Sequence, residues 1–219
     1  MHARGVVNRS GEAGLEHSFR DEQRHVLERI GDRPLAEIPS VAAWRRAFSG
    51  FGVEPTRYRS AVEALLRRLT KQGEIPSLNT LVDLANLVSI RYGLPVAVFD
   101  QRSVSGSTTV RFAEGGEAFT DLGGDGSVNH PEPGEVIFVD DVGLVSARRW
   151  CWRQSAESAS RPDTTEILVT VEGHHDDAAA DVFAAVTDLR ALLELHAGDP
   201  KIETAVLTLE QPVFQGIAG

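Results

Sequence analysis

The stretch that decides the fold covers residues 76–100 and reads PSLNTLVDLANLVSIRYGLPVAVFD. In its first half the apolar residues recur at helical intervals, and Gly93 is a typical helix stop. The second half changes to a short run of β-branched and aromatic residues that ends at Asp100. The stretch therefore predicts a helix over about 80–92, followed closely by a strand over 96–99.

Helical spacing recurs on the N-terminal side of this stretch. Apolar residues fit helices over 15–30, 41–48 and 61–71. Ser60 stands three residues before Glu63, which is the capping-box pattern that starts a helix. The first 92 residues are therefore predicted to be mainly helical.

Strand patterns dominate the C-terminal side. Short β-branched runs bounded by Gly, Pro, Asp or Ser occupy residues 108–112, 135–139, 166–171 and 205–209. Residues 177–196 are rich in Ala and Leu and have helical spacing. We expect a sheet built largely from antiparallel strands, with at least one helix packed on it.

Chain length sets the domain organisation. A chain of 219 residues with 42% hydrophobic residues is long enough for one substantial core and short for two. We expect an α/β fold of the α+β type, a single domain over 1–219 with the N-terminal helices packed on the sheet. Residues 1–14 are predicted to form a flexible tail.

The charges are unevenly distributed. The net charge is −10, which disfavours tight nonspecific binding of a polyanion. Residues 1–71, however, carry 13 Lys and Arg against 9 Asp and Glu. Any RNA-facing surface is therefore expected in the first third of the chain, although solvated helix faces explain the same arginines.

Composition also bears on compartment and cofactors. Cys151 is the single cysteine, so no intramolecular disulfide can form, which fits a reducing cytoplasm. Residues 1–33 contain no apolar run of signal-peptide or membrane-spanning length. Residues 174–177, His-His-Asp-Asp, are weak evidence for metal binding because no partner motif accompanies them. We expect a cytoplasmic protein without membrane contact, metal or cofactor.

The order and spacing of polar residues in residues 76–100 resemble the B3/B4 editing domain of the phenylalanyl-tRNA synthetase beta subunit. The positions that match are Asn79, Asp83, Asn86, Gly93, Pro95, Phe99 and Asp100. Small stand-alone relatives add three motifs, which here are Tyr58-Arg59-Ser60, Pro133-Gly134-Glu135 and the Arg148–Arg153 run RRWCWR. The synthetase domain usually has His where this chain has Ala97, so no role of that imidazole carries over.

The resemblance implies a trans-editing aminoacyl-tRNA deacylase, which hydrolyses mischarged aminoacyl-tRNA with a positioned water molecule. Asn79 and Asp140 are the predicted catalytic residues, expected to converge on one cavity. The Asn79 amide would contact the ester or ribose, and Asp140 would pair with the α-ammonium group. Without that resemblance, Asn79 is a helix N-cap and Asp140 a turn residue.

The same resemblance predicts a binding site for the aminoacylated 3′ end of tRNA. Arg148 and Arg149 would contact phosphates, and Trp150 would stack on a base. Arg59 and Ser60 are also assigned to substrate binding, while core packing and helix capping are the structural alternatives. The motif is expected to be a strand, with its two tryptophans on one face.

Two other functions fit the same sequence. A noncatalytic module would bind amino acids, aminoacyl groups or tRNA ends without turnover, as the departure at Ala97 favours. A hydrolase of small esters or amides would use the same pocket without RNA contacts. The sequence does not specify the amino acid, the tRNA or the oligomeric state.

Overall fold

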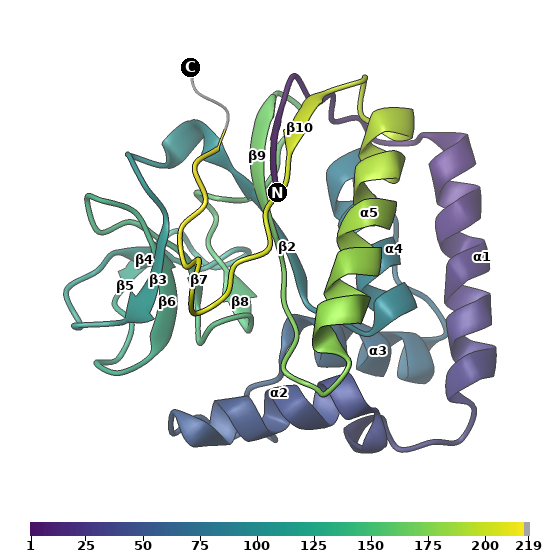
Figure 1. The fold of residues 1–219 in the computed structure, drawn as a ribbon, viewed down its shortest axis with the longest axis horizontal. Helices are drawn as coiled ribbons and strands as arrows, with labels where there is room; N and C mark the ends of the chain where they lie inside the picture. Colours follow the sequence, from purple (N-terminus) through teal and green to yellow (C-terminus); the bar gives the residue numbers. More distant parts are fainter. Residues whose placement is uncertain (217–219) are drawn as a thin grey trace.

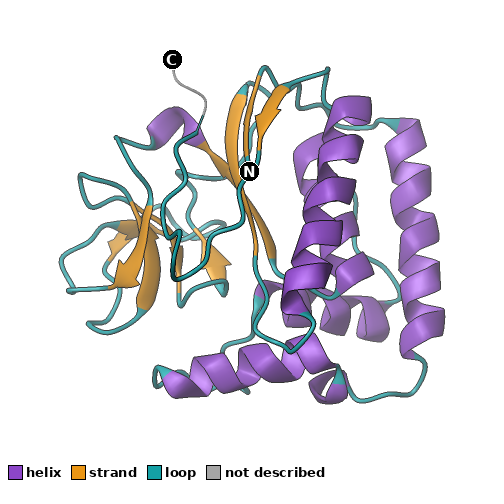
Figure 2. Cartoon of the chain, viewed as in Figure 1, coloured by secondary structure: helices purple, strands orange, loops and turns teal. Residues whose placement is uncertain are grey.

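The structure is a computed structural model that describes residues 1–216, with helices beside and below two packed sheets (Figures 1 and 2). The α-helices are α1 (Ala13–Ile30), α2 (Pro39–Gly50), α3 (Ala61–Gln72), α4 (Thr80–Tyr92) and α5 (Ala178–His196), with single 3-10 turns η1 (Leu35–Glu37) and η2 (Gln101–Ser103). The strands are β1 (His2–Arg4), β2 (Val96–Asp100), β3 (Thr109–Phe112), β4 (Phe119–Thr120), β5 (Val128–Asn129), β6 (Val136–Val139), β7 (Val145–Arg148), β8 (Arg153–Gln154), β9 (Glu166–Val171) and β10 (Lys201–Glu203).

The strands form two four-stranded sheets and one hairpin. The first sheet has the order β10-β1-β9-β2, the second β3-β6-β7-β8, and β4 pairs with β5. Every pairing between these strands is antiparallel. Helices α1, α4 and α5 lie on one side of the first sheet, and the second sheet lies on the other (Figure 1). The predicted α+β fold, with helices on a largely antiparallel sheet, is confirmed.

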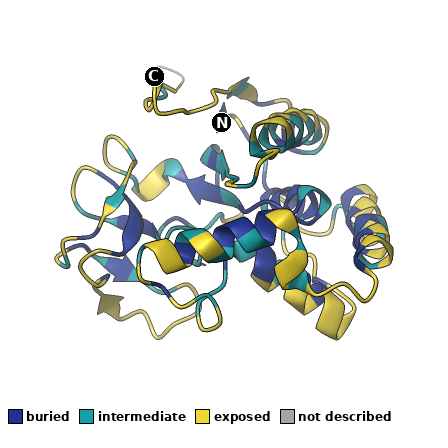
Figure 3. Ribbon diagram, turned by 60° about the horizontal axis from the view of Figure 1, so that its bottom comes forward, coloured by how far each residue is buried: buried dark blue, intermediate teal, exposed yellow. Residues whose placement is uncertain are grey.

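Side chains along β2 and β9 point alternately to the two faces of the first sheet, so that each face belongs to a different hydrophobic core. Val98, Ile167 and Val169 point toward the helices and join the large core there. Their neighbour Phe99 points to the other face, where it packs on Phe138 of the second sheet, with ring centres 5.3 Å apart. Figure 3 shows the buried residues on the strands and on the inward faces of the helices. The first sheet is thus covered on both faces.

Local signals located the helices well. Helix α4 occupies Thr80–Tyr92 as predicted, and Gly93 ends it with a left-handed φ of 68°. At the start of α3 the Ser60 side chain accepts a hydrogen bond from the backbone N–H of Glu63. Both helices end at a glycine that adopts φ > 0 without steric cost.

The predicted flexible tail over residues 1–14 is wrong. Strand β1 lies between β10 and β9 in the first sheet, and the Ala3 side chain is fully buried. A three-residue strand has too few positions to show alternation, so only its partners, more than 160 residues away, reveal it.

The predicted strand over residues 205–209 is also wrong. Within residues 1–216 the last strand is β10, which begins four residues earlier, and Val206, Leu207 and Leu209 are exposed. Pairing with β1 selects residues 201–203 in spite of the stronger β-branched pattern that follows. Within the described residues, no helix has the length and apolar character needed to cross a bilayer.

Candidate functional site

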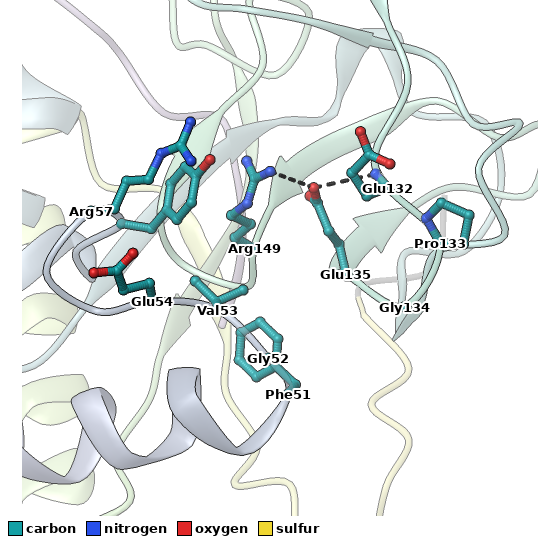
Figure 4. A pocket seen from close by; sticks show the side chains of 11 residues that line it. Phe51, Gly52, Val53, Glu54, Arg57, Glu132, Pro133, Gly134, Glu135 and Arg149 are labelled. Atoms are coloured by element: carbon teal, nitrogen blue, oxygen red, sulfur yellow. Dashed lines mark hydrogen bonds and ion pairs between the residues drawn. The ribbon is translucent and has the colours of Figure 1, made fainter.

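A cavity of about 380 Å³ opens between the loop that joins α2 to α3 and the loop that joins β5 to β6 (Figure 4). Charged and aromatic side chains line it together with apolar ones. The lining residues are Phe51, Gly52, Val53, Glu54, Arg57, Tyr58, Glu132, Pro133, Gly134, Glu135 and Arg149. The cavity lies within the usual size range of small-molecule sites, which is roughly 300–1,000 Å³.

Arg149 lies between the two walls of this cavity (Figure 4). Its guanidinium carbon is 4.1 Å from the centre of the Tyr58 ring and 4.8 Å from that of Trp152. Its Nη2 lies 2.7 Å from Oε1 of Glu135. Burial lowers the pKa of Arg149 below its usual value, although the negative charge of Glu135 acts to raise it. The guanidinium is therefore held by two rings and a carboxylate.

The backbone at Arg149 forms a turn instead of the predicted strand. Arg149 and Trp150 have φ values of 45° and 61°, which are left-handed for residues with side chains. Each such residue costs on the order of 1 kcal/mol or more, so the surrounding packing must hold the turn in place. The strand prediction for the Arg148–Arg153 motif is thus wrong except at its two ends, which belong to β7 and β8.

Glu135 binds two arginines at once. Arg148 donates from Nε to Oε2 at 3.0 Å and from Nη2 to Oε1 at 2.6 Å, beside the contact from Arg149. The Glu135 side chain is 5% exposed, and those of the two arginines are 12% and 13% exposed. Both guanidiniums predicted to bind tRNA phosphates are therefore engaged inside the protein.

Trp150 is part of an aromatic cluster behind the cavity. Its ring centre lies 5.3 Å from that of Trp44 and 5.0 Å from that of His174, in edge-to-face contacts. Its Nε1 donates to Oε2 of Glu172 at 2.5 Å. Burial raises the pKa of the Glu172 carboxyl, although this hydrogen bond opposes the shift. Because its ring packs on Trp44 and His174 and its nitrogen binds Glu172, Trp150 is a packing residue in this conformation and is not available to stack on a base.

The thiol next to Trp150 is not activated. Burial raises the pKa of Cys151 well above its ordinary value, and the nearby Glu172 charge raises it further. A thiol with a raised pKa supplies little thiolate, which is the nucleophilic form. Among residues 1–216, no three side chains of His, Cys, Asp or Glu gather to hold a metal ion.

Arg59 and Ser60 make structural contacts at the start of α3. The Ser60 hydroxyl caps the helix, and Arg59 Nε lies 3.7 Å from Oε1 of Glu63. Arg45 reaches the same Glu63 oxygen at 2.6 Å. Neither Arg59 nor Ser60 lines the cavity, although Tyr58 of the same motif does.

Asn79 caps α4 with its own side chain, whose Oδ1 accepts a hydrogen bond from the backbone N–H of Val82 at 3.0 Å. The neighbouring Thr80 N–H donates to the carbonyl of Arg9, so this end of the helix packs on the N-terminal segment. The contacts of Asn79 are those of an ordinary N-cap.

Asp140 organises the turn after β6. Its Oδ2 accepts from the N–H of Ser105 at 2.9 Å, and its Oδ1 from those of Val142 and Leu144 at 3.0 and 2.8 Å. Helix α4 and the second sheet lie on opposite sides of the first sheet (Figure 1). Neither Asn79 nor Asp140 lines the cavity, so the structure does not bring the two predicted catalytic residues together there.

The cavity instead gathers residues from the three motifs named above for the stand-alone relatives. Tyr58, Glu135 and Arg149 each come from a different one of these motifs, and all three line the cavity. Sequence reasoning assigned only Arg149 among them to substrate binding. Arg57 belongs to the first third of the chain, where an RNA-facing surface was expected, and Glu132 received no functional role from the sequence. The spacing of the motifs was the available signal, but only the fold shows that they meet.

Comparison with known proteins identifies the family. Residues 43–193 match the sequence model of the B3/4 domain. The chain belongs to the B3/4 domain family. This B3/4 domain is 30% identical over 164 residues to the phenylalanine–tRNA ligase beta subunit of Mycobacterium leprae, which covers 71% of this chain and 18% of that protein.

Other relatives carry the same name. The phenylalanine–tRNA ligase beta subunit of Nitrobacter winogradskyi is 37% identical over 107 residues, or 49% of this B3/4 domain and 13% of that protein. This chain thus spans only a small part of the length of these relatives. A crystal structure of an N-terminal fragment of the phenylalanyl-tRNA synthetase beta subunit from Pyrococcus horikoshii has a TM-score of 0.43 at 14% identity, covering 53% of this chain and 40% of that one.

Proposed function

We propose that this B3/4 domain hydrolyses the ester of mischarged aminoacyl-tRNA, acting on a tRNA that another protein has aminoacylated. One observation carries the proposal. The three segments through which the chain resembles stand-alone editing-type proteins line a single cavity, through Tyr58, Glu135 and Arg149. Family membership over residues 43–193 supports it, since the named relatives are beta subunits of a tRNA ligase.

The proposed reaction needs a positioned water molecule. Water adds to the ester carbonyl carbon, the bond from that carbon to the ribose oxygen breaks, and the ribose oxygen takes up a proton. The products are the free amino acid and tRNA with an intact 3′ end. The raised pKa of Cys151 argues against a covalent thioester route. Polar groups that orient water and stabilise the oxyanion are sufficient for an ester that is already reactive.

The experiment is a deacylation panel. Purified tRNAs that each carry a wrong amino acid are incubated with the protein, and loss of the ester is followed against the spontaneous rate. Acceleration for at least one pair supports the function. If no pair is hydrolysed faster than without protein, the hydrolase proposal fails.

The catalytic roles of Asn79 and Asp140 stay predictions that the same panel can test. Asn79→Ala and Asp140→Asn remove a cap and a turn acceptor, and we expect both to lower stability. If the two residues are structural only, the deacylation rate per folded molecule stays near the wild-type value well below the unfolding temperature. A rate loss in fully folded protein would instead support a role in the chemistry.

The noncatalytic module is the second candidate, and Ala97 is the observation that favours it. Ala97 packs in the apolar cluster with Phe99 and Phe138, at the position where the synthetase domain usually has His. A protein of this kind would bind a stable amide analogue of aminoacyl-tRNA while leaving the ester intact. The deacylation panel and a binding titration together separate the two candidates.

A further inference from the structure

We propose that a second copy of this chain pairs with β10 across a two-fold axis. The pairing joins the first sheets of the two copies into one continuous sheet and places their α5 helices side by side. Strand β10 is the outermost strand of the first sheet, and β1 is its only strand partner among residues 1–216. The residues that line the cavity all lie between positions 51 and 149. The proposed surface is therefore separate from the candidate site and does not depend on the proposed function.

The middle residue of β10 directs its backbone groups outward. In β9 the N–H of Val169 donates to the carbonyl of Met1, so alternation along β1 turns the backbone groups of His2 toward β10. The residue opposite His2 in β10 is Glu203. Alternation along β10 then turns the N–H and C=O of Ile202 to the open side of the strand. An antiparallel copy of the strand can form hydrogen bonds with both of these groups.

The side chains of β10 are complementary to those of a second, antiparallel copy. When Ile202 lies opposite Ile202 of the second copy, Lys201 of each copy lies opposite Glu203 of the other. Both charged side chains are exposed, and neither forms an ion pair among the described residues. Opposite charges directly across two strands stabilise the pair, and like charges destabilise it. Parallel pairing in the same register would place Lys201 opposite Lys201, so the charges favour the two-fold arrangement, which closes as a dimer.

Apolar side chains flank β10. Charges on a short edge strand also serve to prevent pairing, and a three-residue ladder is much smaller than a stable interface, which buries roughly 1,200–2,000 Å² in total. Exposed apolar surface beside the strand supplies the missing area. Among residues 1–216, six of the twelve exposed large hydrophobic side chains lie in α5 or after β10, namely Phe183, Leu195, Val206, Leu207, Leu209 and Val213. Such a concentration of exposed apolar side chains is typical of a contact surface for another protein chain.

The flank of α5 that carries Phe183 is turned toward the β10 edge of the sheet. Asp188 marks the opposite flank, because it accepts a hydrogen bond from Arg91 of α4 at 2.7 Å. Phe183 stands five positions earlier, about 140° around the helix, and is 67% exposed. Helix α4 packs on β2, which is the other edge strand of the first sheet (Figure 1). Since α4 lies toward β2, the Phe183 flank faces the β10 edge, where the second copy brings its own α5 against it.

The test measures the oligomeric state by sedimentation velocity from about 1 to 100 μM protein, a range in which a weak dimer forms. We expect the wild type to form a dimer within this range. Lys201→Glu and Glu203→Lys each place like charges opposite each other, so each should weaken the dimer roughly 10- to 100-fold. A mixture of the two variants has opposite charges at both positions and should form a mixed dimer with near wild-type affinity. Because mixing cannot repair a variant that fails to fold, this rescue reports on the contact itself.

A third variant tests the apolar flank. Phe183→Asp should weaken the dimer at least about 10-fold, because it places a charge in the contact without a partner. The matched control Phe112→Asp replaces a phenylalanine that is 62% exposed on β3, in the other sheet, and should keep the wild-type dimer. Arg67→Glu and Glu74→Lys change exposed charges in and after α3, and they control for net charge. Thermal unfolding checks that each variant is folded.

Rescue by mixing, together with a weakened dimer in Phe183→Asp, supports the inference. Wild-type protein that stays monomeric up to about 100 μM overturns it. A dimer that persists unchanged in any of the three variants, or that the mixture of charge variants does not restore, also overturns it, since the second copy then uses another surface or register. Deacylation of mischarged tRNA is measured separately, so its success or failure leaves this result unchanged.

Discussion

Glu135 is predicted to be the most costly single charge to remove near the cavity. Glu135→Gln keeps the side-chain volume but leaves the guanidiniums of Arg148 and Arg149 without a carboxylate while they are 12% and 13% exposed. Removing one partner of a buried ion pair typically costs about 3–5 kcal/mol, because the remaining charge stays desolvated. Since the amide can still accept one hydrogen bond, we expect a loss of about 3 kcal/mol.

The assay is urea unfolding at pH 7, followed by tryptophan fluorescence and repeated by thermal scanning. A loss of ~3 kcal/mol lowers the Tm of a chain of this size by roughly 6–12 °C. The control is Arg153→Gln, which breaks an ion pair with Asp121 whose arginine is 45% exposed, and it should cost less than ~1 kcal/mol. Equal, small losses in the two variants would refute the view that Glu135 organises the cavity wall.

Three further predictions concern capping, acid stability and thiol reactivity. Asn79→Ala should lower the free energy of unfolding in urea by ~1 kcal/mol, because α4 loses its N-cap, and an unchanged midpoint would contradict this role. Burial raises the pKa of Glu117, but hydrogen bonds from backbone N–H groups and Arg111 outweigh it and lower the pKa from 4.5 to about 2. The stability that this charge contributes is present above pH 4.5 and is lost as the pH falls toward 2, so Glu117→Gln should lose less stability on acidification than the wild type; parallel acid profiles would contradict the assignment. Cys151 should react slowly with a thiol reagent at pH 8 until urea unfolds the protein, because desolvation raises its pKa, and fast modification of folded protein would contradict the raised pKa.

Local signals account for the part of the fold that the sequence predicted. Helix α4 is bounded by Asn79 and Gly93, whose side-chain and backbone preferences act within one helical turn. Strand β2 follows from the change of hydrophobic period after the helix. Strand β1 could not be predicted in this way, because its pairing partners are more than 160 residues distant and its three residues carry no period.

The candidate site was harder to predict for the same physical reason. Its two walls come from segments about 75 residues apart, and its centre depends on left-handed backbone at Arg149 and Trp150, which residue preferences disfavour. Asn79 was predicted to be catalytic from a family pattern, yet spacing alone already indicated the N-cap that the structure contains. Sequence patterns identified the three motifs, but only the packing of the fold showed which of their side chains line one cavity.

The proposed hydrolysis is tested most directly by the first-order rate of ester loss from mischarged tRNA under single-turnover conditions. At least one wrongly attached amino acid should be released faster with the protein than in buffer. Ester half-lives that are equal with and without protein across all amino acids would contradict the proposal that this B3/4 domain is a deacylase.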